Sequence, residues 1–121
     1  MRQCVSFTLI FMLFLLVPAL ASSQDKGDQK AGKAKYEQLC VGCHGATGKG
    51  DGPAAAALNP KPRDYTHCKE MAKESDANLF KAIKGGGPSI GRSPLMPQWG
   101  GVLKDVEIQN LVAYIRSFCK K

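Results

Sequence analysis

The sequence has few acidic residues and no long apolar run. Seventeen lysines and arginines stand against ten aspartates and glutamates, so the formal charge at pH 7 is +7. The longest apolar run, residues 5–17, is shorter than the roughly 20 residues that a helix needs to cross a bilayer. The chain also lacks alternating strand and helix patterns, which argues against a parallel α/β fold.

Residues 1–21 have the three parts of a secretory signal peptide. Arg2 gives a positive start, the apolar run follows, and residues 18–21 supply the small-x-small pattern that signal peptidase recognises. We therefore expect cleavage at the end of this segment, residues 22–30 as a flexible N-terminal tail, and one domain over residues 31–121. An uncleaved membrane anchor is the alternative. Export would place the protein in the periplasm or another extracytoplasmic compartment.

The most specific motif in the chain is Cys40-Val41-Gly42-Cys43-His44. Two cysteines three positions apart lie on one face of a helical turn, so both sulfurs can bond to the two vinyl groups along one porphyrin edge. The histidine that follows is then held over the ring, where its imidazole can ligate the iron. The spacing therefore predicts one covalently bound haem c, with Cys40 and Cys43 as attachment sites and His44 as proximal ligand.

Two other interpretations of this motif have less support. A thioredoxin-like dithiol needs alternating strands and helices around it, and the sequence lacks them. A zinc site could use both motif cysteines with some of His44, His67 and Cys68, but the second ligand pair has none of the usual spacings.

Apolar side chains at helical spacing indicate three main helices. The first begins near Ala31 and runs into the haem motif, the second follows the N-cap residue Ser75, and the last covers residues 108–119. Gly32 is poor helix material unless another element passes close over it. We therefore expect the first and last helices to cross near Gly32 and Tyr36.

Prolines fix the segments that follow the haem motif. Residues 59–65 should be extended, and a proline carbonyl in this segment could accept a hydrogen bond from the free nitrogen of His44. Arg63 in the same segment could pair with a haem propionate, because a guanidinium matches a carboxylate in geometry. Met96 lies in a loop with a proline on each side, where its thioether could approach the iron from the face opposite His44.

Met96 has rivals for the sixth coordination position. His67 would give a bis-histidine haem, and an open position would admit small ligands. Met71 lies in a charged stretch and Met12 lies in the signal peptide, so both have less support.

With these motifs the sequence resembles the class I c-type cytochromes, in their small single-haem bacterial form. The resemblance implies an all-α cytochrome c fold with three main helices around one haem, Met96 as distal ligand, Trp99 among the haem-binding residues, and one haem edge exposed. Lys104 departs from the pattern, since such helices usually start with Ser or Thr; the cap should be weaker or move to Asp105. The matching residues are Gly32, Tyr36, residues 40–44, the turns at residues 50–53 and 59–64, residues 96–99 and residues 111–116.

Cys68 and Cys119 remain once the haem and signal-peptide cysteines are assigned. Two such thiols in an oxidising compartment predict a disulfide that fastens the last helix to the middle of the chain. Two separate buried thiols are the alternative.

The basic charge narrows the choice of partners. Loss of Arg2 with the signal peptide leaves 16 basic and 10 acidic residues, a formal charge of +6. The lysines are spread along the chain, and export separates the protein from nucleic acid, so nucleic acid is not an expected partner. The charge either serves solubility alone or steers the protein toward acidic docking faces on redox partner proteins.

The expected function is that of an exported electron carrier, not an enzyme. It would be a monomer that touches the membrane peripherally at most. The alternatives are a haem enzyme or sensor with an open or His-ligated sixth position, and a fixed cytochrome subunit of a larger oxidoreductase complex.

Overall fold

The computed structural model describes residues 26–120, and the predicted signal peptide lies outside them. The described residues form helices and connecting loops without any strand, as expected of an all-α fold. None of the helices in this part of the chain is long and apolar enough to cross a membrane. The elements are α1 (Gln29–Leu39), α2 (Val41–His44), the 3-10 turn η1 (Ala55–Ala57), α3 (Cys68–Met71), α4 (Asp76–Gly85), the 3-10 turn η2 (Gly87–Ile90) and α5 (Asp105–Ser117).

Helix α1 begins at Gln29, two residues before the predicted start near Ala31. Asp28 is its N-cap, because its carboxylate accepts the backbone N–H groups of Lys30 and Ala31 at 2.8 and 3.1 Å. The N–H of Asp28 in turn donates to the Asn110 side-chain oxygen at 2.6 Å. The prediction of a flexible tail through residue 30 is therefore wrong at its C-terminal end, where the chain caps α1 and is tied to α5.

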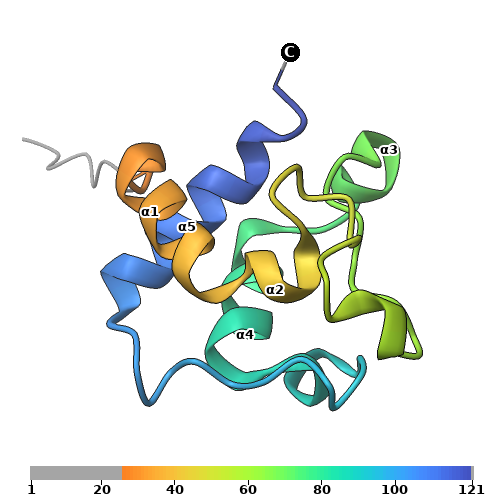
Figure 1. Cartoon of the computed structure of the whole chain (residues 1–121). Coiled ribbons are helices and arrows are strands. Elements are labelled where there is room, and N and C mark those ends of the chain that lie inside the picture. Colours follow the sequence, from red (N-terminus) through yellow and green to blue (C-terminus); the bar gives the residue numbers. More distant parts are fainter. Residues whose placement is uncertain (1–25, 121) are drawn as a thin grey trace, which may run out of the picture.

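Helices α1 and α5 cross at Gly32, as the sequence predicts (Figure 1). A Cβ atom on this glycine would lie 1.9 Å from the carbonyl oxygen of Asn110, so only glycine permits the approach. One turn later Tyr36 is completely buried, and its ring packs edge-on against Tyr114 with centroids 5.2 Å apart. The crossing fixes the direction in which α1 delivers the chain to α2.

Helix α5 starts after Lys104, whose side chain has no acceptor with which to cap it. Half of a capping box remains, because the Glu107 carboxylate accepts the N–H of Lys104 at 2.9 Å. The cap is thus weaker, as expected, but it does not move to Asp105. The buried face of the helix consists of Ile108, Leu111, Val112 and Ile115.

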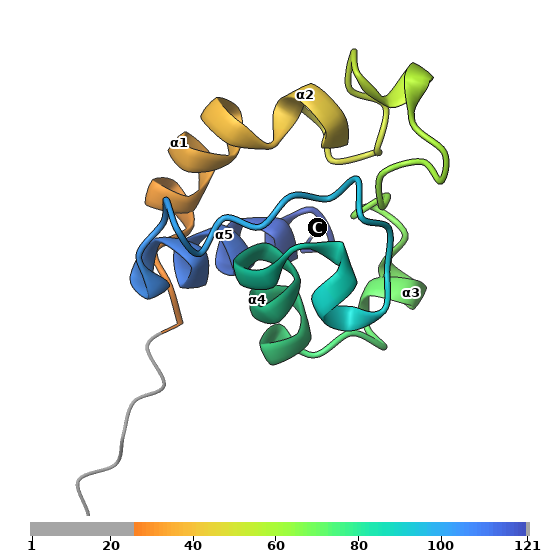
Figure 2. The same cartoon turned by 90° about the horizontal axis from the view of Figure 1, so that it is seen from below.

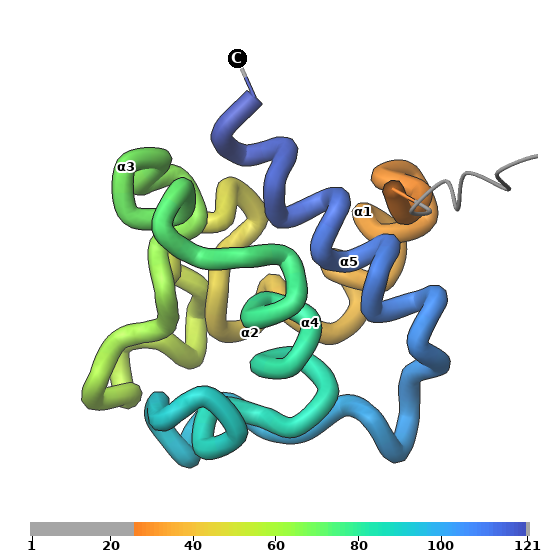
Figure 3. The backbone as a smooth tube through the Cα atoms, turned by 180° about the vertical axis from the view of Figure 1, so that it is seen from behind, coloured from red at the N-terminus to blue at the C-terminus, as the bar shows by residue number. Residues whose placement is uncertain are grey.

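Helix α4 lies at the centre of the molecule seen from behind, with α1 and α5 on one side and α3 on the other (Figure 3). Ser75 caps it by accepting the N–H of Asn78 at 3.0 Å, as predicted. Leu79 and Ile83 join its buried face to the core. The chain from α4 to α5 then runs through η2 and along the lower edge of the molecule in Figure 1, and Figure 2 shows this segment face on from below.

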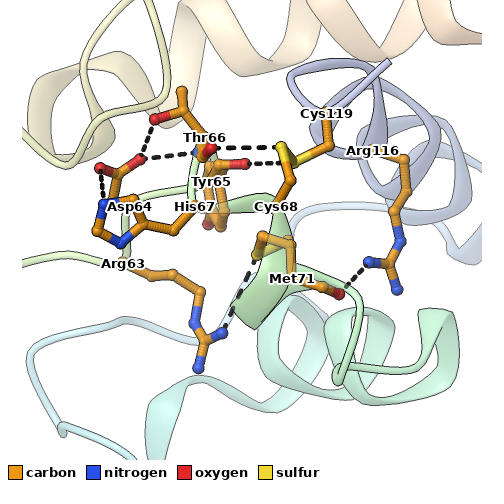
Figure 4. The surroundings of a disulfide bond; sticks show 9 residues. All are labelled: Arg63, Asp64, Tyr65, Thr66, His67, Cys68, Met71, Arg116 and Cys119. Carbon is orange, nitrogen blue, oxygen red and sulfur yellow. Dashed lines mark hydrogen bonds and ion pairs between the residues drawn. A yellow bond between two sulfur atoms is a disulfide. The ribbon is translucent and has the colours of Figure 1, made fainter. Parts of the chain in front are cut away.

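A disulfide joins Cys68 at the start of α3 to Cys119 just after α5, which confirms the predicted pairing (Figure 4). The two sulfurs lie 3.3 and 3.2 Å from the carbonyl oxygens of Thr66 and Tyr65. Arg116 supports the same junction by donating to the Met71 carbonyl at 2.6 Å. The end of α5 is therefore fastened to the segment that contains Tyr65.

Replacing Gly32 with Ala should lower the free energy of unfolding by about 1 to 3 kcal/mol, because the new methyl group overpacks the α1–α5 crossing. Urea denaturation measures the loss. Gly101→Ala is the control, since a Cβ there meets nothing within 4 Å. Equal stability of the two variants would contradict the crossing.

Replacing both Cys68 and Cys119 with Ser should lower the free energy of unfolding by about 2 to 4 kcal/mol, because the unfolded chain loses a crosslink over a separation of 51 residues. Thermal denaturation of the double variant checks this. Intact mass without reductant, before and after thiol alkylation, tests the pairing itself. Alkylation of either cysteine would rule out the bridge.

Candidate functional site

The haem motif forms the turn that ends in α2. The backbone N–H groups of Cys43 and His44 donate to the Cys40 carbonyl at 3.2 and 2.9 Å, so the two cysteines share one helical turn as predicted. Both cysteines carry free thiols and are partly buried. Burial, assisted by neighbouring Cys43, raises the pKa of Cys40 to about 11. The thiol of Cys40 is thus protonated at neutral pH in the unmodified chain.

His44 is the buried polar group at the end of this turn, 8% exposed. Its Nδ1 lies 3.1 Å from the carbonyl oxygen of Arg63, and because a carbonyl can only accept, Nδ1 carries the proton. The expectation that a proline carbonyl fills this role is wrong: Pro62 places its own carbonyl against Gly50, and the next residue accepts from His44. The extended path predicted for residues 59–65 is interrupted at both ends: residues 61–64 have no helix, turn or bend, whereas residues 59 and 60 form a bend and Tyr65 begins a turn.

The protonation state of His44 suits ligation. Burial lowers the pKa of His44, although the Arg63 carbonyl opposes this by stabilising the N–H form. The ring is therefore neutral near pH 7, with Nδ1 protonated and a lone pair on Nε2. The hydroxyl of Tyr65 lies 3.3 Å from that Nε2. A metal ligand needs this neutral, correctly oriented imidazole.

Tyr65 is a site residue that the sequence did not reveal. Its ring stacks on that of His44 with centroids 4.6 Å apart and planes 16° from parallel. Burial strongly raises the pKa of Tyr65, so the hydroxyl keeps its proton. Its position directly after the proline-fixed segment, as an aromatic among polar residues, was the available signal.

His44 lines a cavity of about 550 Å³. This volume lies within the range of small-molecule and cofactor sites. Apolar side chains from α4, α5 and the loops form most of the wall, and charged groups gather in part of it. The apolar lining includes Leu58, Leu79, Ile83, Ile90 and Ile115, and the charged lining includes Arg63, Asp64, Glu70, Lys73, Glu74 and Arg92.

Met96 lines the same cavity as His44, at a point far along the chain. It is partly buried, and its carbonyl accepts the N–H of Gly87 at 3.0 Å, which ties its loop to η2. The thioether is the only methionine sulfur in the described residues that comes from a cavity-lining residue, because Met71 packs into the core instead. The structure thus brings together the two residues predicted as axial ligands.

Of the other predicted site residues, some line the cavity and some pack against the core. Arg63 lines the cavity, and its guanidinium pairs with Glu74 at 2.8 Å. Cys43 also lines the cavity, whereas Cys40 packs against the core beside it. Trp99 does not line the cavity: it packs against the core, and its backbone N–H donates to the Ile83 carbonyl at 3.0 Å.

The rival sites fare less well. His67 also lines the cavity, but its side chain is 72% exposed and its Nε2 lies 3.7 Å from the Asp64 carboxylate. A zinc site that uses Cys68 is blocked because that sulfur is in the disulfide. Within residues 26–120, no group of three or more His, Cys, Asp or Glu side chains is arranged to hold a metal ion.

Glu74 is a second site residue that the sequence did not reveal. Its side chain is only 13% exposed, and its carboxylate binds Arg63 and Arg92 at 2.8 and 3.0 Å. The amide of Asn78, followed by the two guanidinium groups, holds the pKa of Glu74 below its usual value against the opposing effect of burial. In the sequence it lies in a charged stretch typical of a solvated surface, so no signal marked it.

Comparison with known proteins decides the family. A model of the family "cytochrome c oxidase, cbb3-type, subunit III" matches residues 27–115. The chain belongs to this family. It is 29% identical over 99 residues to the cbb3-type cytochrome c oxidase subunit CcoP of Azospirillum sp. (strain B510), a match that covers 77% of this chain and 29% of that relative. The chain therefore spans less than a third of the length of this curated relative.

A solved structure supports the same assignment. The KustC0563 c-type cytochrome is 27% identical, with a TM-score of 0.57, and the match covers 72% of this chain and 95% of that one. The resemblance to class I c-type cytochromes, the all-α cytochrome fold and the single covalently bound haem c are thus confirmed. The protein is a small c-type cytochrome with one haem c.

The cavity fits that cofactor. A porphyrin is a broad apolar ring with two carboxylates on one edge, and this cavity combines an apolar wall with two arginines. His44 offers a neutral imidazole whose Nε2 is free of backbone contacts. The free thiols of Cys40 and Cys43 lie on the helical turn that leads to it.

Gly50 packs closely against Pro62, the residue before Arg63, whose carbonyl accepts from His44. Its backbone has a φ of +72°, and a Cβ there would lie 2.3 Å from the Pro62 carbonyl oxygen. Gly50→Ala should therefore lose about 1 to 2 kcal/mol of stability for the left-handed backbone and about 1 to 3 kcal/mol more for overpacking. Urea denaturation measures both.

The matched control is Gly91→Ala, which has a φ of +69° and nothing within 4 Å of the added Cβ. It should show the backbone penalty alone. If the two variants lose the same stability, the close approach of Gly50 to the Pro62 carbonyl does not constrain position 50.

Proposed function

We propose that this cytochrome transfers single electrons between redox partner proteins through a haem held by Cys40, Cys43, His44 and Met96. Cys40 and Cys43 would form the two thioether bonds, and His44 and Met96 would ligate the iron from opposite faces. The bound haem supplies a one-electron couple between ferric and ferrous iron. The observation that carries this proposal is that His44 and Met96 line one cavity although they are far apart in sequence.

The protein contributes three properties to this function. Its imidazole is kept neutral by burial, and the Arg63 carbonyl orients it by holding the proton on Nδ1, which leaves Nε2 as the nitrogen that could ligate the iron. Its apolar wall excludes water, and a thioether ligand favours the ferrous state, so both should raise the reduction potential. Arg63 would bind a haem propionate with the part of its guanidinium that Glu74 leaves available. Trp99 would support the haem pocket from the core behind it.

A carrier is favoured over an enzyme because a methionine is available for the sixth position. An enzyme or sensor needs an open position at the iron, and the tether of Met96 through Gly87 argues against one. The second candidate is a fixed cytochrome subunit of a larger complex. It is supported by the similarity to CcoP, which is named as an oxidase subunit and is much longer than this chain.

An extracytoplasmic location is supported by two independent features. Residues 1–21 have the pattern of a cleavable signal peptide. The disulfide between Cys68 and Cys119 is typical of an oxidising compartment such as the periplasm. We expect a monomer, at most peripheral to the membrane, whose basic surface meets acidic faces of its redox partners.

Met96→Ala should abolish the near-infrared absorption band of sulfur on ferric iron, lower the reduction potential and let the reduced protein bind carbon monoxide. The spectrum of the oxidised protein measures the band, a redox titration followed by absorption measures the potential, and the spectrum of the reduced protein under carbon monoxide measures ligand binding. Met71→Leu is the control, because Met71 is 2% exposed and packs in the core. A band that survives Met96→Ala would refute this ligand assignment.

The steering role of the lysines can be tested by salt. Electron transfer to an acidic redox protein should slow as ionic strength rises, because salt screens exposed charges beyond about 10 Å at 0.1 M. Oxidation by an uncharged small molecule serves as the reference reaction and should change little. If electron transfer to the acidic protein is as insensitive to salt as the reference reaction, the positive charge does not steer docking and serves solubility alone.

A further inference from the structure

The Glu74 carboxylate is a bridge between three separate segments of the chain. Its Oε1 accepts from Arg63 at 2.8 Å and from Arg92 at 3.0 Å, and its Oε2 accepts from the Asn78 amide. Arg63 belongs to the extended segment after the haem motif, Arg92 to the loop after η2, and Asn78 to α4. No other carboxylate in residues 26–120 pairs with two arginines.

The two arginines lie on the segments that support the two proposed ligands. The backbone carbonyl of Arg63 is the acceptor for His44. On the other segment, the N–H of Arg92 donates to the Gly87 carbonyl at 2.8 Å, and the N–H of Gly87 donates to the Met96 carbonyl at 3.0 Å. One carboxylate therefore connects the segment whose carbonyl binds His44 with the loop that bears Met96. This loop, residues 91–104 between η2 and α5, is called the Met96 loop below.

The backbone of Glu74 is itself fixed. Its carbonyl accepts from Arg116 on α5, and its N–H donates to the Met71 carbonyl at 3.2 Å. The side chain extends from this fixed position with 13% of its surface exposed, whereas Arg92 is 57% exposed. Glu74 is thus anchored through both its backbone and its side chain, and the exposed end of the bridge is Arg92 on the loop that bears Met96.

Both ion pairs of the bridge depend on the negative charge of the Glu74 carboxylate. Two guanidinium groups meet a single carboxylate, so the cluster keeps one surplus positive charge. Without the carboxylate, the two cations would repel each other at the cavity wall, and partly buried Arg63 would keep only the proposed haem propionate as a charged partner. Repulsion between them separates the two segments.

The geometry points to Glu74 as a positioning residue that keeps the Met96 loop closed over the cavity. This inference rests on the proposed His44 and Met96 ligation. An added ligand must displace Met96 to bind, and the ion pairs of Glu74 with Arg63 and Arg92 contribute to the free energy that this displacement costs. Glu74 touches neither proposed ligand and acts through Arg63 and Arg92.

Imidazole binding to the oxidised holoprotein tests this role. Imidazole can take the sixth position only in molecules whose Met96 loop is open, so its apparent dissociation constant falls as the open fraction rises. Glu74→Gln should lower that constant about tenfold, which corresponds to about 1.4 kcal/mol. Arg92→Gln, at the exposed end of the bridge, should act in the same direction and should fold normally.

The control is Glu37→Gln, which removes a carboxylate that does not line the cavity. Glu37 is 58% exposed and pairs with Lys33 on its own helix at 3.8 Å, so imidazole binding should not change. Glu74→Asp should recover part of the effect, because the charge returns on a shorter side chain. Melting temperatures of all four variants separate a general loss of stability from opening of the loop.

The inference is overturned if Glu74→Gln and Arg92→Gln bind imidazole like the unmodified protein, even if they melt earlier. It is also overturned if Glu37→Gln matches Glu74→Gln, since charge alone would then explain the result. If the unmodified protein lacks the sulfur–iron band at the outset, both this inference and the proposed ligation fail. A normal band with unchanged imidazole binding refutes the bridge alone.

Discussion

The hydrogen bond from His44 Nδ1 to the Arg63 carbonyl decides what the cavity can do. It fixes the tautomer of a buried, neutral imidazole and leaves the lone pair on Nε2, where the only side-chain partner in the described residues is the Tyr65 hydroxyl at 3.3 Å. Burial alone would give a neutral ring without choosing between its nitrogens. The carbonyl is held in place by the close approach of Pro62 to Gly50, and the stacked ring of Tyr65 sets the plane of the imidazole.

The rest of the fold supplies the fixed frame for that contact. The α1–α5 crossing at Gly32 sets where α1 hands the chain to the haem motif. The disulfide at Cys119 fastens the end of α5 to the segment that contains Tyr65. Both tethers converge on the same few residues around His44, so a small core can hold a site whose parts are distant in sequence.

The cofactor, the main helices and the helix crossing were predictable because short patterns in the sequence determine each of them. Cysteine and histidine spacing gave the cofactor, apolar periodicity gave the helices, and one helical glycine gave the crossing. The carbonyl partner of His44 and the role of Glu74 depend on how loops meet in three dimensions, and no local pattern encodes that. The early start of α1 was missed because the Asp28 cap precedes the first apolar residue of the helix.

The site around His44 requires covalent attachment of one haem to residues 40–44. Mass spectrometry of the mature protein under denaturing conditions, followed by sequencing of the peptide that contains these residues, tests it. We expect the mass of the polypeptide plus one haem, with the haem on the peptide that holds Cys40 and Cys43. A mass equal to that of the polypeptide alone would contradict the account.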